Sequence, residues 1–270
     1  MNTNKFPINY IKSAFPPLKA FQNRHLLSWL QMVFVFLMMT FAMLLPVYNH
    51  YQDVEVFSIE DFYPSVVEMI DDQTLEEFES VDLNQGILTL SNPFTIEYDQ
   101  GIIAGNTVMK DFSEYEDVPN ILLFRSHDFI IRDVTGDERL IPYSEQSTLD
   151  NQDKKGFVQA LSQMYTTQYR SEMIFTLTVV VYGFIFLFSL FIVFLYAYLI
   201  KSMKDFSMSS IVSYKEAVNF ILNLIVLPTI AAVLFGFIRF NLILMMAIQV
   251  VGLIALLIYV FRVTNFEDLS

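Results

Sequence analysis

Residues 173–200 read MIFTLTVVVYGFIFLFSLFIVFLYAYLI, a run of 28 residues without a charge between Glu172 and Lys201. As a helix rising about 1.5 Å per residue, the run would reach about 42 Å, which exceeds the roughly 30 Å of a bilayer's hydrocarbon core. The run therefore predicts a transmembrane helix over residues 173–200. It also divides the chain, because a long polar segment precedes it and two further apolar runs follow it.

Composition is typical of an integral membrane protein. Of the 270 residues, 54% are hydrophobic, 16% are aromatic and only 17% are charged, which is too apolar for an ordinary soluble domain. Between Tyr51 and Glu172 there are 25 acidic and 7 basic residues, a net charge of −18, whereas the rest of the chain has 4 acidic and 9 basic residues, a net charge of +5. The absence of cysteine excludes disulfides and thiolate chemistry.

Three further apolar runs predict transmembrane helices over residues 26–48, 217–238 and 240–261. The first run carries Trp29 and Tyr48 near its two ends, where aromatic residues anchor a helix in the lipid headgroups. A cleaved signal peptide is the rival interpretation of this run, but no small-residue cleavage motif follows it. Arg239 is the lone charge between the last two runs, so we expect a tight turn with Arg239 as a headgroup anchor rather than an anion site.

Residues 49–170 predict a folded domain rather than a linker, since aromatic and branched residues recur throughout. Apolar spacing predicts helices over residues 59–70 and 149–170, the last leading into the span at residue 173, and residues 75–78 either continue the first helix or begin another. A change of period and turn signals predict strands at residues 87–90, 94–98, 121–124, 129–132 and 139–142. The expected fold is an α-helical polytopic membrane protein, with four transmembrane helices and a small α+β extracytoplasmic domain inserted between helices 1 and 2.

Lysine and arginine in the short polar segments predict the orientation. Residues 1–25 contain four of them and no acid, the loop at 201–216 contains three and the tail at 262–270 contains one, against one in the turn at Arg239. Both termini are therefore expected in the cytoplasm and residues 49–170 outside the cell. We expect residues 1–25 to lie on the cytoplasmic headgroups, with a docking arm for a partner as the alternative.

Several short stretches carry a resemblance to a known family, namely YIKSAFP at residues 10–16, NQGILT at 84–89, PFTI at 93–96, ILLF at 121–124, FII at 129–131 and IPYS at 141–144. With one span, an exported domain and three closely spaced spans in that order, the chain resembles the MalA-type maltodextrin-utilisation membrane proteins of Gram-positive bacteria. The resemblance implies the cell membrane of a Gram-positive bacterium and a role near maltodextrin uptake. It implies no reaction and supplies no catalytic residues.

Two motifs of residues 49–170 have both a chemical and a structural interpretation. The sequence DVTGD at residues 133–137 is similar to the phosphorylated loop of transport ATPases, but valine replaces the lysine that should follow the aspartate, so a hairpin turn is expected. Carboxylates dense enough to attract Ca²⁺ or Mg²⁺ lie at Asp71, Asp72, Glu76, Glu77, Glu79 and Asp82. This run lacks the glycine turn of a calcium loop, which favours a solvated acidic face.

The three histidines, His25, His50 and His127, are too scattered for a zinc site. We therefore expect no catalytic residue, no cofactor and no metal. Polar residues inside the last two spans are instead expected to join helices. Asn219 and Asn223 share one helical face and Gln249 stands at a matching depth in the next span, so hydrogen bonds across the helical hairpin are expected.

Ala232 and Gly236 form a small-xxx-small pair, which allows close contact between helices.

Two functions from different classes are compatible with these features of the sequence. The first is a non-enzymatic accessory protein whose partners are the lipid bilayer and either sugar-importer permease subunits or a second copy of itself, with no nucleic acid. The alternative is a self-contained membrane sensor or transport component whose outer domain binds a ligand. Tyr98, Tyr115 and Tyr143 are then residues of the type that contacts sugars.

Overall fold

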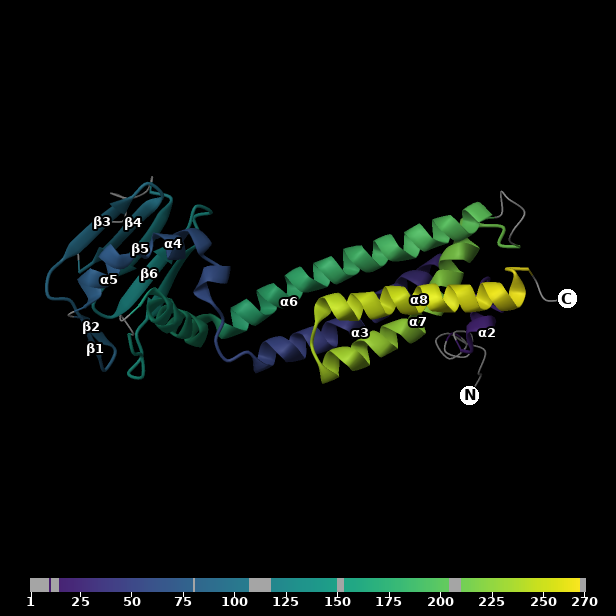
Figure 1. Ribbon diagram of the computed structural model, residues 1–270, viewed down its shortest axis with the longest axis horizontal. Coiled ribbons are helices and arrows are strands. Elements are labelled where there is room, and N and C mark those ends of the chain that lie inside the picture. Colours follow the sequence, from purple (N-terminus) through teal and green to yellow (C-terminus); the bar gives the residue numbers. More distant parts are fainter. Residues whose placement is uncertain are drawn as a thin grey trace. The chain divides into compact units, whose positions relative to one another are not determined.

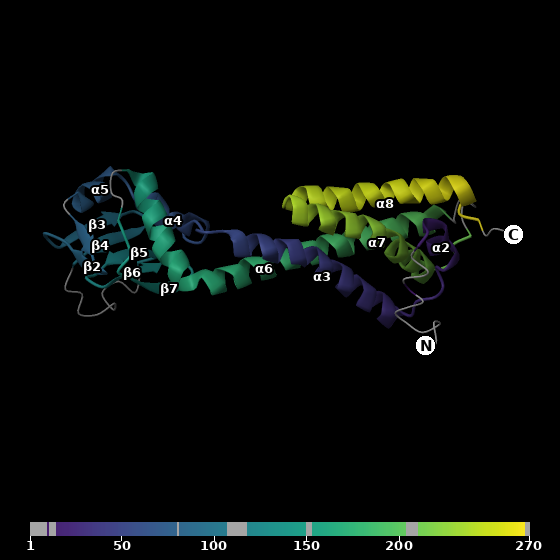
Figure 2. The same ribbon diagram turned by 90° about the horizontal axis from the view of Figure 1, so that it is seen from below.

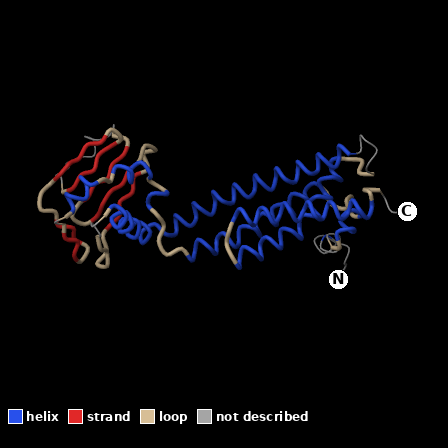
Figure 3. Tube along the Cα trace, in the orientation of Figure 1, coloured by secondary structure: helices blue, strands red, loops and turns tan. Residues whose placement is uncertain are grey.

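The computed structural model describes Tyr10 and residues 15–79, 81–106, 118–149, 153–203 and 210–267. The chain divides into a helical unit, Met1–Asp53 with Ile174–Ser270, and a sheet unit, Val54–Met173. The helix α6 (Lys154–Met203) begins in the sheet unit and continues without a break into the helical unit (Figure 1). Four long apolar helices, with a small sheet between the first of them and α6, confirm the predicted fold class at the level of architecture (Figure 3).

The helical unit contains the four helices that are long and apolar enough to cross a membrane, which are α3 (Trp29–Asp53), α6, α7 (Tyr214–Ile238) and α8 (Leu242–Thr264). A short helix, α2 (Pro17–Gln22), precedes them. Ser213 accepts a hydrogen bond from the backbone N–H of Glu216 and so caps α7, while Asn241 caps α8 in the same way. Only residues 239–241 connect α7 to α8, as the two adjoining apolar runs predicted.

The helix α7 lies at the centre of this unit and packs against both α8 and α3. Its first half is buried almost without interruption, from Ala217 to Ile225. Further along, Pro228 is accommodated because Gly252 of α8 stands opposite it. A Cβ atom at Gly252 would lie 2.8 Å from Cβ of Pro228, well inside van der Waals distance.

The sheet unit contains a hairpin and a five-stranded sheet. The hairpin pairs β1 (Asp82–Asn84) with β2 (Ile87–Thr89). The sheet has the order β3 (Phe94–Tyr98), β4 (Gly101–Gly105), β5 (Asn120–Phe124), β6 (Asp128–Arg132) and β7 (Glu138–Pro142). Neighbouring strands are antiparallel except for β4 and β5, which are parallel.

Sequence patterning identified β2, β3, β5, β6 and β7 but missed β1 and β4. The sequence of β4, GIIAG, has a glycine at each end, and glycine is a turn signal, so patterning does not identify it as a strand although all five residues are buried. Strands with a parallel neighbour and two covered faces are typically apolar throughout. Gly101 is also required sterically, since a Cβ atom there would collide with the backbone of Asn120 in β5.

Helices line one face of the sheet, as the two views in Figures 1 and 2 show. These are η1 (Ile59–Asp61), α4 (Pro64–Met69), α5 (Asp72–Phe78) and the start of α6. Phe78 of α5 is fully buried, with its ring 4.6 Å from that of Phe124 in β5 and 4.9 Å from that of Phe157 in α6. This aromatic cluster joins α5, β5 and α6 into one core.

The prediction of a single helix over residues 59–70 is wrong. The structure breaks it into η1 and α4, with Tyr63 at φ −131° and ψ 57° between them. Tyr63 precedes Pro64, and the proline ring disfavours the helical conformation for the residue before it. Val66 and Ile70 are nevertheless buried, as their spacing predicted.

Candidate functional site

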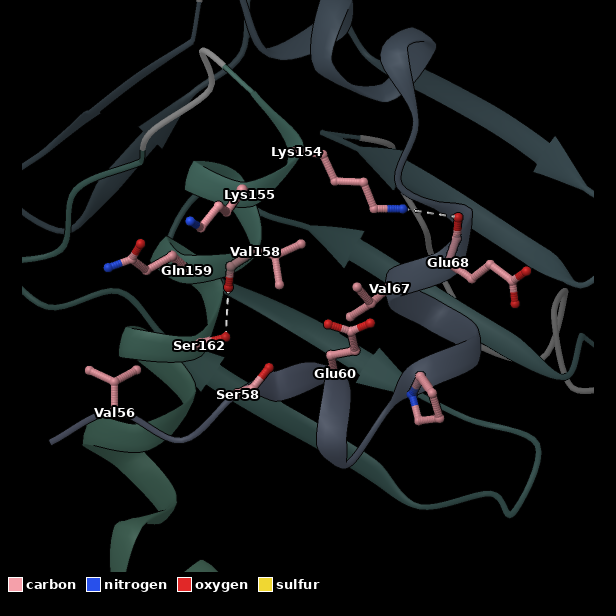
Figure 4. Close-up of a pocket in the computed structure, with 11 residues that line it drawn as sticks. Val56, Ser58, Glu60, Val67, Glu68, Lys154, Lys155, Val158, Gln159 and Ser162 are labelled. Carbon is pink, nitrogen blue, oxygen red and sulfur yellow. Dashed lines mark hydrogen bonds between the residues drawn. The ribbon is translucent and has the colours of Figure 1, made fainter. Parts of the chain in front are cut away.

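A large hollow of the sheet unit lies between the chain leading into α4 and the first turns of α6 (Figure 4). Its volume is about 880 Å³. Val56, Val67 and Val158 supply apolar walls, while polar groups come from Ser58, Gln159 and four charged residues. A mainly apolar hollow of this size with a few polar groups is typical of a ligand site.

Two hydroxyl groups of α6 fix the backbone at Phe57 and Ile59, in the segment that forms one wall of this hollow. The backbone N–H of Phe57 donates to Oγ1 of Thr166, and that of Ile59 donates to Oγ of Ser162, both at 3.0 Å. Both hydroxyls are 3% exposed, so these bonds are shielded from water. The extended segment before η1 is thereby fixed against α6 although it belongs to no helix or strand.

The four charged residues of the hollow are Glu60, Glu68, Lys154 and Lys155, two of each sign. Lys154 donates from Nζ to the backbone oxygen of Glu68 at 3.4 Å, as Figure 4 shows. Both lysines are exposed and stand in the first turn of α6, where no acidic residue balances them. The hollow thus presents donors and acceptors without a large net charge.

A second, smaller hollow of about 210 Å³ shares Glu68 with the first. It is also lined by Met69, Tyr98, Asp99 and Gln100. Tyr98 is the last residue of β3, and Glu68 and Met69 are the last two of α4. The end of α4 therefore lies between the two hollows and contributes to both.

Hydrogen bonds fix the ring of Tyr98. Its hydroxyl donates to Oδ1 of Asp71 at 2.8 Å and lies 2.9 Å from the hydroxyl of Thr74. Partial burial and the carboxylate of Asp71 raise the pKa of Tyr98 to about 12, against a lowering effect of Thr74, so its hydroxyl stays neutral. Partial loss of water raises the pKa of Asp71, but hydrogen bonds from Thr74 and Tyr98 outweigh that effect and hold it below its usual value.

Of the three tyrosines considered for sugar contact, Tyr98 is the one that the structure places at a hollow. Tyr143 is only 9% exposed and stacks on Phe129 with ring centroids 6.2 Å apart, so it belongs to the core. Tyr115 lies outside the described residues. No spacing in the sequence distinguishes these three residues, because their exposure depends on which elements cover them.

The acidic run and the DVTGD motif have local structural roles. Asp71 caps α5 by accepting from the backbone N–H of Thr74. Asp133 accepts from both the backbone and the hydroxyl of Thr135 within the turn between β6 and β7, which confirms the predicted hairpin turn. Among the residues that the structure describes, no three His, Asp or Glu side chains are grouped as a metal site requires.

A further charged cluster of the sheet unit was not anticipated. Arg139 of β7 binds both carboxylate oxygens of Glu172 in α6, at 3.0 and 2.7 Å, and also contacts Asp137 at 3.1 Å. These two carboxylates raise the pKa of Arg139, although partial burial lowers it. Arg139 and Glu172 are 33 residues apart, so only the fold brings them together.

In the helical unit, the amides predicted to join helices are all buried. Asn223 donates to Oδ1 of Asn219 at 3.1 Å, one turn earlier on α7. Gln249 of α8 donates to the hydroxyl of Thr229 on α7 at 2.8 Å. The bond across the hairpin therefore pairs Gln249 with Thr229, and not with the two asparagines that were expected to be its partners.

Ala232 and Gly236 of α7 are both buried. A Cβ atom at Gly236 would lie 2.7 Å from Sδ of Met245 in α8 and 2.9 Å from Cβ of Pro46 in α3. Three helices meet at this glycine, whereas the sequence pattern alone predicted a contact with one unspecified neighbour.

The three expected interfacial anchors are exposed. Trp29 is the first residue of α3 and is 50% exposed, and Tyr48 lies near the other end of the same helix and is 46% exposed. Arg239 forms the C-cap of α7 and is also exposed. These positions leave all three side chains on the surface of the helical unit.

One buried ion pair of the helical unit escaped the sequence analysis. Arg24 is 3% exposed, lies 4.4 Å above the ring of Phe21 and approaches Glu216 at 3.8 Å. It also donates to the hydroxyl of Ser210 at 3.3 Å. Residues 1–25 were expected to lie on a membrane surface, but Phe21 and Arg24 pack into the helical unit. The capping pattern from Ser213 to Glu216 was the signal in the sequence that Glu216 has a structural role.

Two known proteins are similar to this chain over nearly its whole length, whereas no family model and no solved structure matches it. YvdJ of Bacillus subtilis strain 168, a protein named for maltodextrin utilization, is 25% identical over 275 residues, covering 97% of this chain and 91% of the relative. The maltodextrose utilization protein MalA of Streptococcus pneumoniae strain R6 is 25% identical over 270 residues, covering 97% of each. These likenesses confirm the resemblance to MalA-type proteins.

Proposed function

We propose that this chain, which resembles MalA-type maltodextrin utilization proteins over nearly its whole length, is a non-enzymatic membrane protein that assists maltodextrin uptake by associating with a transporter. The observation that carries the proposal is this full-length likeness, joined to four helices long and apolar enough to span a membrane. The sequence contains no catalytic signature, so the proposal assigns no reaction to the chain.

In this proposal the protein lies in the cell membrane of a Gram-positive bacterium, with both termini in the cytoplasm and residues 49–170 outside. The distribution of lysine and arginine between the short polar segments supports this orientation. The net charge of −18 between Tyr51 and Glu172 keeps that segment away from anionic lipid. The proposed partners are sugar-importer permease subunits, or a second copy of the chain, within the bilayer.

The helix α6 is the proposed contact for a partner. Of the four apolar helices, α6 has the smallest share of its most apolar stretch buried within the structure. Phe184, Leu187 and Phe191 are all more than half exposed along it. These side chains form one helical stripe, and that stripe is the surface of α6 on which a partner helix could pack in place of lipid.

Purification of the tagged protein from its native membrane, in a gentle detergent, tests the association. We expect permease subunits in stoichiometric amount, and their loss when Phe184 and Phe191 are replaced by alanine. The matched control replaces two exposed residues of α8, Ile243 and Val251, by alanine and should retain the subunits. Recovery of the chain alone contradicts the proposed association, whereas recovery as a homo-oligomer excludes the permease subunits and leaves a second copy of the chain as the partner.

A self-contained sensor or transport component whose outer domain binds a ligand is the second candidate function. The two hollows of the sheet unit that share Glu68 favour it. Binding of a ligand by the purified protein, together with its recovery from the native membrane without importer subunits, supports this alternative.

A further inference from the structure

The two hollows around Glu68 together offer the groups that a neutral polyhydroxylated ligand requires. Lys154 and Lys155 supply donors, while Glu60, Glu68 and Asp99 supply acceptors, so the formal charges nearly cancel. A hydroxyl group both donates and accepts, and it is served by such a mixture of groups. A strongly charged ligand of either sign would meet repulsion as well as attraction.

Apolar surface is provided in both hollows. Val56, Val67 and Val158 form walls of the larger hollow, and the ring of Tyr98 lines the smaller one. The ring is held by hydrogen bonds to Asp71 and Thr74, so it offers a fixed flat surface at little cost in side-chain entropy. Sugar rings carry apolar C–H faces between their hydroxyl groups, and such faces stack on fixed aromatic rings.

Continuity favours a chain of sugar units over a single one. The larger hollow has a volume of about 880 Å³ and the smaller one about 210 Å³, and Glu68 lines both. Lys154 donates to the backbone oxygen of Glu68 within the lining of the larger hollow (Figure 4). A linear ligand that occupies one hollow can therefore extend past Glu68 into the other.

We propose that the two hollows form one binding site for a linear maltooligosaccharide, with Glu68 at its centre and Tyr98 at the end that stacks on a sugar ring. The choice of an α-linked glucan rests on the proposed role in maltodextrin use, whereas the oligosaccharide class rests on the hollows themselves. Glu68 binds hydroxyl groups through its carboxylate, and Lys155 and Gln159 bind them from α6.

Isothermal titration calorimetry of the full-length protein in lipid nanodiscs tests this site. The protein is prepared without maltoside detergents, because their headgroup is itself a maltose. Maltotetraose is the probe and cellotetraose, which is β-linked, is the comparison. We expect maltotetraose to bind and cellotetraose to bind at least about tenfold more weakly, a difference of about 1.4 kcal/mol.

Variants locate the site. Glu68→Ala and Lys155→Ala each remove one hydrogen-bonding group and should weaken binding about threefold to tenfold. Tyr98→Leu should weaken it similarly, whereas Tyr98→Phe keeps the ring but releases it from Asp71 and Thr74, so its loss of binding should be smaller than that of Tyr98→Leu. The matched control is Glu97→Ala, an exposed carboxylate on β3 that lines neither hollow. The thermal unfolding midpoint of each variant shows whether it is folded.

Three results overturn the proposal: no heat with maltotetraose, equal binding of cellotetraose, or unchanged binding in folded Glu68→Ala and Lys155→Ala variants. The measurement uses no importer subunit, so its failure leaves the co-purification result intact. Conversely, loss of co-purification leaves sugar binding measurable. The failure of this inference and the failure of the proposed function are therefore distinguishable.

Discussion

Gly236 provides the sharpest test of how the helical unit is held together. Replacing it by alanine adds a Cβ atom 2.7 Å from Sδ of Met245 and 2.9 Å from Cβ of Pro46. Favourable contacts between carbon atoms lie at about 3.5–4.0 Å, so both neighbours must move. The far end of the Met245 side chain is flexible although the residue is fully buried, whereas Cβ of Pro46 is part of a rigid proline ring within α3, so the contact with Pro46 is the harder one to relieve.

The size of the expected loss of stability is worked out by comparison with Gly183, a matched glycine. At Gly183 of α6, none of the described residues has an atom within 4 Å of the Cβ position. Gly183→Ala and Gly236→Ala gain the same helix propensity, about 1 kcal/mol, so the difference between them isolates the steric contact. Overpacking of this kind costs about 1–3 kcal/mol, and Gly236→Leu should cost more.

The assay is reversible unfolding of the purified protein in mixed micelles, followed by helical circular dichroism as the fraction of sodium dodecyl sulfate rises. Gly236→Ala is expected to be less stable than Gly183→Ala by about 1–3 kcal/mol. Met245→Ala should recover part of that loss when combined with Gly236→Ala, which a double-mutant cycle measures. Equal stability of the two alanine variants within about 0.5 kcal/mol would refute the three-helix contact.

Further predictions concern one polar group each. Thr229→Val leaves Gln249 without its acceptor and should lower the unfolding free energy by about 0.6–2 kcal/mol, whereas Thr229→Ser should not, in the same micelle assay. Glu172→Gln breaks the two-point ion pair with Arg139, so we expect a loss of at most about 1 kcal/mol that shrinks in 1 M salt, measured as a shift in unfolding midpoint. Asp71 has a lowered pKa in the folded state, so its contribution is present above the unfolded pKa of about 3.9 and is lost as pH falls through the lower folded value. Asp71→Asn keeps the helix cap and should therefore show a smaller loss of stability between about pH 5 and pH 2, and an identical acid profile would contradict this assignment.

Properties that depend on local pattern could be predicted from the sequence. Four apolar runs predicted four long helices because the length needed to cross a bilayer is a property of the run itself. The turn at Arg239 followed from the same arithmetic, and the DVTGD turn followed from its residue types. Five strands followed from short apolar runs between turn signals, whereas β4 escaped because the glycines at both of its ends resemble turn residues.

The sequence by itself thus determined the class of this protein, the order of its elements, and which segments suit lipid and which suit water. Only the tertiary structure decided which distant residues meet. It pairs Gln249 with Thr229, surrounds Gly236 with Met245 and Pro46, and places Tyr98 rather than Tyr143 at a hollow beside Glu68. Periodicity records which face of an element is apolar, but a partner across the fold depends on register and crossing geometry that neither segment encodes alone.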